Sequence, residues 1–284
     1  MTLLQITVLA LVQGIAELLP VSSSAHVILA EKLMHLDPTA PDMTLLLVML
    51  HTGTMFAVIA YFWTEWKATY FSSGQAFRRN AGLIVIATAA TGLVGLALLK
   101  LIPYALGANR DTFEIEHLFG NVYVIAGGLA AAGVLILVSG LRMRTHSASE
   151  KLKPASALSI GVVQGLCLPF RGFSRSGATI STGLLTGVSR LRAEEFSFAL
   201  AVVLTPAVIA REAYRLFKSS GGLGAGQWLH LALPSLLGMA ISFVAGMIAL
   251  RWLSRWLENG RWHYFGIYCL AMSAVVLYAQ GRVL

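Results

Sequence analysis

The sequence predicts an all-α integral membrane protein with six transmembrane helices and two re-entrant helical hairpins in an inverted-topology repeat. Composition is the first ground: 57% of the 284 residues are hydrophobic and only 12% are charged, against about 25% charged residues in soluble domains. The mean hydropathy of +0.73 agrees. The second ground is six apolar stretches near the roughly 20 residues that a helix needs to cross a bilayer. The third is a short interrupted motif that occurs twice.

The repeated motif is a short apolar helix, a break at Pro or Gly, a polar cluster and a second short apolar stretch. Its parts are Gln13-Gly14-Ile15, Pro20 and Ser22-Ser23-Ser24 in the first copy, and Gln164-Gly165-Leu166, Pro169 and Ser174-Arg175-Ser176 in the second. Interrupted segments at matching positions in two halves of a membrane protein are the best sequence indication of a buried site. We therefore expect function where the two copies meet.

The two copies lie in regions 2–34 and 156–187, which are apolar but broken near their middles. Neither region contains a clean span, so each is predicted to be a re-entrant hairpin. Broken backbone at membrane depth is tolerated only where protein or a water-filled cavity covers it. Each hairpin therefore needs such cover.

Three full spans are predicted after each hairpin. They run near 42–63, 80–102 and 119–141, and near 194–213, 229–251 and 262–280. Aromatic residues typical of membrane interfaces flank them: Trp63, Trp66, Tyr70, Trp228, Trp252, Trp256, Trp262 and Tyr264. An odd number of spans in each half reverses the second half, so the repeats are inverted.

The chain is thus predicted to be a single membrane domain, 1–284. Its repeat halves, about 1–141 and 156–280, are joined by a polar linker at about 142–155. The linker and the loops at 64–79 and 251–261 are basic, as cytoplasmic loops are, whereas the loop at 103–118 is acidic. The acidic loop and both termini are then external, although Arg211, Arg215 and Lys218 run against this orientation.

The net charge of +8 raises the question of nucleic acid as a partner. The basic residues cluster in loops between apolar spans, as orientation signals do. We therefore expect no nucleic-acid partner, and we expect contact with membrane lipid, including anionic head groups.

Glu17 is the first candidate for chemistry, because an unpaired carboxylate in an otherwise apolar helix is costly in a membrane. Gln13 lies four residues earlier on the same helix face. Together they offer oxygen ligands to a hard divalent cation, Mg²⁺ or Ca²⁺. The alternative is a hairpin held together by polar hydrogen bonds.

The polar cluster after Pro20 suits an anion. Ser22, Ser23 and Ser24 stand at the start of a helix, where free backbone N–H groups and the helix dipole favour phosphate. Serines there are also ordinary N-caps. His26 is close enough to exchange protons with a bound substrate or a serine hydroxyl, although a lone His in an apolar helix is more often a packing residue.

The second copy adds a permanent positive charge. Arg175 carries a planar fork that matches phosphate oxygens. Since no acid lies near it in the sequence, it pairs either with Glu17 across the repeat or with a substrate phosphate. The hydroxyls of this helix start belong to Ser174, Ser176 and Thr179.

The roles of two other groups of polar residues stay open. His51, inside the first full span, is assigned equally to packing and to lining a site. Arg192, Glu194 and Glu195 are expected near a membrane interface in mutual pairs.

Taken together, the motifs resemble those of a known family. They are Gln13-xxx-Glu17, Leu19-Pro20-Val21-Ser22-Ser23-Ser24-Ala25-His26, Gly172-Phe173-Ser174-Arg175-Ser176-Gly177-Ala178-Thr179 and Glu194-Glu195-Phe196-Ser197-Phe198. The chain is similar over essentially its whole length to bacterial undecaprenyl-diphosphate phosphatases of the bacitracin-resistance type. The resemblance implies a multi-pass hydrolase of the bacterial cytoplasmic (inner) membrane. It would convert undecaprenyl diphosphate to undecaprenyl phosphate, return the carrier to cell-wall synthesis and confer bacitracin resistance.

The resemblance also implies roles for individual residues. Ser23 is the candidate nucleophile and His26 its acid/base partner, with Glu17 and Arg175 completing the catalytic set. Gln13 and Glu17 match a pair tied to a divalent cation. The polyprenyl diphosphate would be bound by Ser22, Ser24, Ser174, Ser176 and Thr179. A homodimer is one option for the oligomeric state.

Two positions depart from the pattern of this family. Many members have Glu where this chain has Gln13, so the metal site would have one less negative charge. Arg171 replaces a usual Pro, which changes the backbone restraint of the second motif.

Three readings compete with a serine phosphatase. Within the same chemistry, His26 or Glu17 could activate water directly. The other class is a transporter or flippase for an anionic polyprenyl lipid, which shares inverted repeats and a midplane anion site. Transport needs no nucleophile beside an acid/base group, so Ser23, His26 and Glu17 together favour the enzyme. A purely structural subunit leaves Glu17 and Arg175 unexplained.

Overall fold

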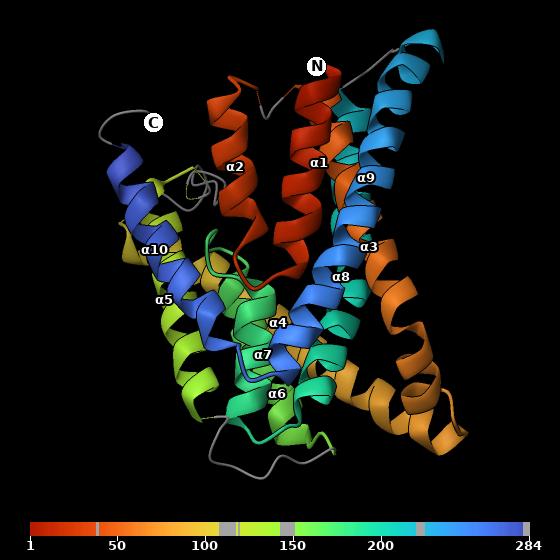
Figure 1. Cartoon of the computed structure of the whole chain (residues 1–284), viewed down its shortest axis with the longest axis vertical. Coiled ribbons are helices and arrows are strands. Elements are labelled where there is room, and N and C mark those ends of the chain that lie inside the picture. Colours follow the sequence, from red (N-terminus) through yellow and green to blue (C-terminus); the bar gives the residue numbers. More distant parts are fainter. Residues whose placement is uncertain (38–39, 108–117, 119, 143–150, 220–224, 281–284) are drawn as a thin grey trace.

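The computed structural model of the chain describes residues 1–37, 40–107, 118, 120–142, 151–219 and 225–280. Their elements are all α-helices, as predicted (Figure 1). In order they are α1 (Leu3–Leu18), α2 (Ser23–Leu33), α3 (Pro41–Tyr70), α4 (Gly74–Ala105), α5 (Val122–Arg142), α6 (Pro154–Cys167), α7 (Arg175–Leu185), α8 (Arg190–Ser219), α9 (Ala225–Glu258) and α10 (His263–Gln280). Most of the predicted linker (143–150) and of the predicted acidic loop (108–117) lies outside the described residues.

The long helices are those of a multi-pass membrane protein. In the described residues, five helical stretches are long and apolar enough to cross a bilayer: Asp42–Tyr70, Gly74–Ala105, Val122–Arg142, Arg190–Arg211 and Ala232–Glu258. They correspond to the first five predicted spans. The sixth, 262–280, corresponds to α10, whose 18 residues pack along α5.

The two interrupted regions are each a pair of short antiparallel helices. Helix α1 begins with a capping box, in which Thr2 and Gln5 exchange hydrogen bonds, and ends at Leu18 before the extended residue Leu19. Helix α6 begins with Pro154 in its first turn, a position that needs no backbone N–H. The α1–α2 pair enters from the end of the molecule where α1 begins and α10 ends, and the α6–α7 pair enters from the opposite end (Figure 1). Their turns therefore meet near the middle.

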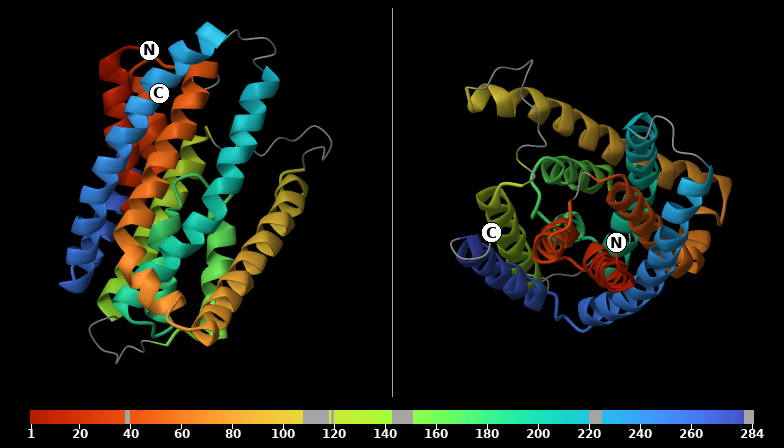
Figure 2. Two further views of the ribbon diagram at one scale, coloured as in Figure 1. Left: turned by 90° about the vertical axis from the view of Figure 1, so that its right-hand side faces the viewer. Right: turned by 90° about the horizontal axis from the view of Figure 1, so that it is seen from above.

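The first hairpin lies close against long helices. Viewed from above, α1 and α2 are near the centre of the bundle, with α3, α5, α9 and α10 around them (Figure 2). A Cβ atom added at Gly14 would lie 2.7 Å from both the Ser242 carbonyl oxygen and the Ala245 Cβ of α9. Small residues that allow such backbone approach are typical of membrane helix contacts.

The second hairpin packs in a related way against α4. Thr91 donates its hydroxyl to the Gly161 carbonyl (3.0 Å) and accepts from the Gln164 side chain (3.0 Å). Gln164 is fully buried. The glutamine of the second copy thus stabilises a helix contact, whereas its counterpart Gln13 lies beside Glu17.

Three of the predicted interfacial aromatics are instead part of the core. Trp66 and Tyr70 are 8% exposed and Trp262 is fully buried. Trp262 donates to the hydroxyls of Ser139 (3.0 Å) and Ser181 (3.1 Å), so its indole N–H is satisfied inside the protein. The sequence placed these residues at the ends of spans but did not predict their burial, because their side chains pack against neighbouring helices.

Gly172 is required by the turn of the second hairpin. Its φ is +101°, and an added Cβ would lie 2.9 Å from the Ile125 carbonyl carbon. We predict that Gly172→Ala lowers the melting temperature in detergent more than Gly187→Ala. Both glycines have positive φ, which costs an L-residue about 1–2 kcal/mol, but an added Cβ at Gly187 meets nothing within 4 Å. Equal shifts would mean that close contact with α5 does not constrain the turn.

Candidate active site

The turns of the two hairpins are joined by an ion pair. Arg175, the first residue of α7, places Nη2 2.7 Å from Oε1 of Glu17 in the last turn of α1. The two side chains are only 24% and 16% exposed. Two partners were expected for Arg175, Glu17 and a substrate phosphate. In the structure, which contains no substrate, the partner is Glu17. A buried charge without its partner is strongly destabilising, so each residue depends on the other.

The second oxygen of Glu17 gathers three polar side chains. Oε2 accepts the Ser23 hydroxyl at 2.5 Å and the Gln13 amide at 3.3 Å. His51 Nε2 lies 4.0 Å from the same oxygen, and His51 Nδ1 lies 2.8 Å from the Leu47 carbonyl oxygen. Because the carbonyl can only accept, Nδ1 carries a proton and Nε2 faces Glu17. His51 therefore lies at the site, which answers the question left open by the sequence.

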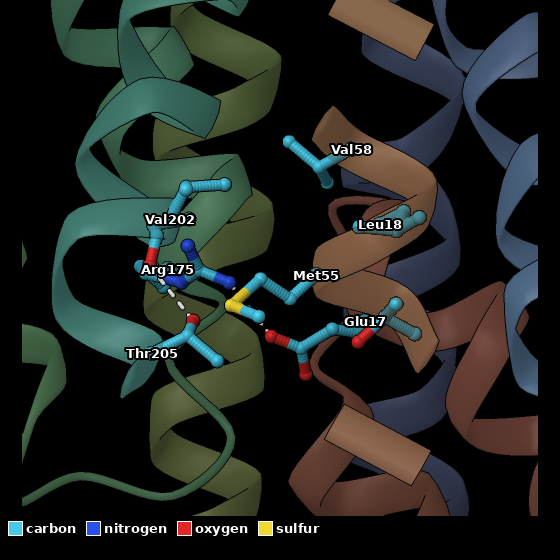
Figure 3. A pocket seen from close by; sticks show the side chains of 9 residues that line it. Glu17, Leu18, Met55, Val58, Arg175, Val202 and Thr205 are labelled. Carbon is cyan, nitrogen blue, oxygen red and sulfur yellow. Dashed lines mark hydrogen bonds and ion pairs between the residues drawn. The ribbon is translucent and has the colours of Figure 1, made fainter. Parts of the chain in front are cut away.

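A small pocket lies beside the ion pair. Figure 3 shows Glu17 and Arg175 pointing toward each other at this pocket, with Met55 and Val58 of α3 and Val202 of α8 around them. Charged groups at one place and apolar walls around them suit an amphiphile that joins an anionic head to a hydrocarbon chain.

The start of α2 has an unusual backbone conformation and no side-chain cap. Ser22 has a φ of +67°, an unusual conformation for a residue other than glycine, and its side chain makes no capping hydrogen bond. The first-turn N–H groups, including those of Ser23 and Ser24, are thus left without a side-chain cap. Strained residues of this kind cluster at functional sites.

The predicted hydroxyl residues of the second copy are buried and bonded within the protein. Ser174 caps α7 by accepting from the Gly177 N–H (3.2 Å), and Ser176 donates to the Leu19 carbonyl (3.2 Å). Thr179 is bonded to the Ser197 hydroxyl at 2.5 Å. In this state these groups hold the two turns in place, and Arg175 is the residue of the second copy that meets Glu17.

His26 lies apart from the Glu17 cluster. Its Nδ1 is 2.8 Å from the Ser22 carbonyl oxygen, and its Nε2 is 2.7 Å from the Tyr268 hydroxyl on α10. Among the described contacts, none joins His26 to Ser23 or Glu17. Sequence reasoning did not single out Tyr268, and Ser197 entered only as part of a family motif, because their partners are far away along the chain.

The side chains around Glu17 include few ligands for a divalent cation. In the described residues, no three His, Cys, Asp or Glu side chains form a group that could hold a metal ion. Mg²⁺, however, is commonly held by one or two carboxylates together with substrate phosphates and water. Glu17 offers one carboxylate. Gln13 donates its amide N–H to Glu17 here and would offer its oxygen if the amide turned, so the pair would fit an ion that shares its ligands with a bound diphosphate.

A second buried polar cluster joins α3, α4 and α8. Arg192 donates to Glu195 at 2.8 Å and also to the Asn80 side chain, and its guanidinium lies over the Tyr70 ring. The mutual pairing expected of Arg192 is therefore confirmed for Glu195. Glu194 instead accepts from the Ser254 hydroxyl of α9 at 2.5 Å.

Comparison with known proteins agrees with these features. The family described as Bacitracin resistance protein BacA matches residues 6–275. Undecaprenyl-diphosphatase 2 of Acinetobacter baylyi is 59% identical over 280 residues, which cover 98% of each chain. Undecaprenyl-diphosphatase 2 of Burkholderia ambifaria is 33% identical over 98% of this chain and 96% of its own. Undecaprenyl-diphosphatase 1 of Burkholderia pseudomallei is 34% identical over 95% and 94%. The chain therefore belongs to the bacitracin resistance protein BacA family.

Proposed function

We propose that this protein is an undecaprenyl-diphosphatase, which removes the terminal phosphate of undecaprenyl diphosphate and leaves undecaprenyl phosphate. The observation that carries the proposal is the cluster in which Glu17 binds both Arg175 and the Ser23 hydroxyl, beside an apolar-walled pocket. A relative with 59% identity is named for this activity. The product would re-enter cell-wall synthesis, and its supply would confer bacitracin resistance.

Substrate binding would use charge from both hairpins. The fork of Arg175 has N–H groups beyond the one bonded to Glu17, and these can bind phosphate oxygens. The first turn of α2 offers backbone N–H groups and the positive end of its dipole. The hydrocarbon chain would lie along the apolar residues of α3 and α8.

The chemical step would begin at Ser23. Its oxygen attacks the terminal phosphorus and forms an O–P bond, while the bond to the bridging oxygen breaks and undecaprenyl phosphate leaves. Glu17 is the better placed acceptor of the Ser23 proton, because the hydroxyl already donates to Oε2. Water then cleaves the phosphoserine and releases phosphate. In the alternative, Glu17 accepts a proton from water, which attacks phosphorus directly.

A divalent cation, Mg²⁺ or Ca²⁺, is part of the proposal. Glu17 and Gln13 would hold it, and when bound it would neutralise charge on the diphosphate oxygens. Gln13→Glu adds a second carboxylate beside Glu17. We predict that this variant reaches half-maximal stabilisation at about tenfold lower Mg²⁺, measured as the shift of its melting temperature.

Without metal, the Gln13→Glu variant should be less stable than wild type. Two carboxylates in contact repel each other, so the variant should melt below wild type in a chelator and recover on addition of Mg²⁺. Gln164→Glu is the matched control, since Gln164 holds the same position in the other hairpin but contacts Thr91. A similar response to Mg²⁺ in both variants would contradict a metal site at Gln13.

The membrane arrangement that we propose has six spans and two re-entrant hairpins in the bacterial inner membrane. The halves, about 1–141 and 156–280, would be inverted repeats of a single domain. The entry of the two helix pairs from opposite ends of the molecule supports this arrangement (Figure 1).

The function is tested by phosphate release. Purified protein in detergent is given undecaprenyl diphosphate, with and without a chelator, and inorganic phosphate is measured over time. We expect multiple turnovers that stop in the chelator. No phosphate release, together with movement of the lipid between leaflets of proteoliposomes, would favour the flippase instead.

A further inference from the structure

Both ring nitrogens of His26 are engaged, and neither partner is a residue of the Glu17 cluster. Nδ1 meets the Ser22 carbonyl oxygen at 2.8 Å, and Nε2 meets the Tyr268 hydroxyl at 2.7 Å. The two rings are nearly parallel, with centroids 5.7 Å apart and an interplanar angle of 13°. The contact joins residues 242 positions apart in the sequence.

These partners fix the protonation pattern of the neutral ring. A carbonyl oxygen has no hydrogen to give, so Nδ1 must carry the proton that it donates to Ser22. Nε2 of the neutral ring is then an acceptor, and the Tyr268 hydroxyl is its donor. If Nε2 gains a proton, the same contact is kept with the direction of donation reversed. Nε2 is therefore the ring nitrogen at which His26 gains or loses a proton, and the Tyr268 hydroxyl covers this atom.

The same part of α10 also contacts the turn that precedes His26. Cys269, next to Tyr268, donates its thiol to the Pro20 carbonyl oxygen at 3.2 Å. Ser22, whose carbonyl oxygen accepts the hydrogen bond from His26 Nδ1, has the positive φ of +67°. Helix α10 therefore contacts the chain on both sides of the strained residue.

We propose that Tyr268 is a positioning residue, whose hydroxyl holds His26 in one tautomer and one orientation beside the start of α2. Its consequence for catalysis rests on the proposed phosphatase function, in which His26 would exchange a proton with the bound substrate at the start of α2. Tyr268 acts through His26, so the loss of its hydroxyl should matter only while His26 is present.

A double-mutant cycle tests this coupling. Tyr268→Phe keeps the ring but removes the hydroxyl, and we expect kcat to fall roughly tenfold with little change in KM, the size of effect expected for one hydrogen bond. In a His26→Gln background the same change should alter kcat by less than about twofold. The matched control is Tyr264→Phe on the same helix, whose described contacts are ring packing against Trp256 and His263; it should retain the wild-type kcat. An equal loss from Tyr268→Phe in both backgrounds would overturn the proposal.

A second readout does not depend on turnover. Diethylpyrocarbonate modifies unprotonated imidazole nitrogens, and the modification of His26 can be followed by mass spectrometry. We expect faster modification in Tyr268→Phe than in wild type and in Tyr264→Phe, because Nε2 loses its cover. Equal rates in all three would overturn the proposal. Wild-type protein that releases no phosphate but shows the expected labelling would count against the phosphatase and for the Tyr268 contact.

Discussion

Arg175→Ala is expected to lower phosphate release by about 10³-fold, close to the limit of detection. The substitution removes the fork that would bind the diphosphate, and a single lost donor to developing charge typically costs about 10²–10³-fold in rate. It also leaves Glu17, only 16% exposed, without the partner 2.7 Å away. Both effects act at the same place, so we expect the loss in kcat to exceed the change in KM. Phosphate release by purified variant and wild type measures it.

Two further variants separate charge from geometry at this position. Arg175→Lys keeps a positive charge without the planar fork and should recover only part of the activity. Arg171→Ala removes another arginine of the same turn. Arg171 is not among the described partners of Glu17, so this variant should retain most of the wild-type rate. Arg175→Ala protein that folds and turns over within tenfold of wild type would remove Arg175 from the mechanism.

The sequence was informative where the physics was local or periodic. The spanning helices and the break at Pro20 could be predicted from apolar run lengths and from the proline. The two pairs of short helices could be predicted in the same way. The pairing of Glu17 with Arg175 could be predicted because a buried carboxylate and a buried guanidinium each need a partner. Their positions in matching halves of the repeat indicated where that partner would be.

The contacts of His26 and Thr179 could not be predicted from the sequence in this way. Tyr268 and Ser197 meet them through the packing of separate helices, and no spacing in the sequence encodes which face of α10 or α8 turns inward. Aromatic residues misled for a related reason: Trp262 is as compatible with a membrane interface as with a buried indole that binds two serines. Only the three-dimensional arrangement separates these environments.

The repeat is symmetric in sequence but not in chemistry. Gln13 lies beside the Glu17 carboxylate, whereas Gln164 is bonded to Thr91 in a helix contact. The first copy supplies Glu17 and Ser23, and the second supplies Arg175. Each half therefore provides one sign of charge at the centre, and neither half alone would form the site.

Ser23→Ala is expected to lower phosphate release by about 10³-fold or more if Ser23 is the nucleophile, as with other removed nucleophiles. Ser24→Ala should lose less, since in the described structure Ser24 makes no hydrogen bond to Glu17. With substrate labelled in its terminal phosphate, rapid denaturation during turnover should trap the label on Ser23 of wild type and on no residue of the alanine variant. Direct attack by water predicts no trapped label on wild type and a substantial rate of phosphate release in Ser23→Ala. In that case Glu17 would still accept the proton, because its Oε2 would then be free to bind the water that replaces the serine hydroxyl.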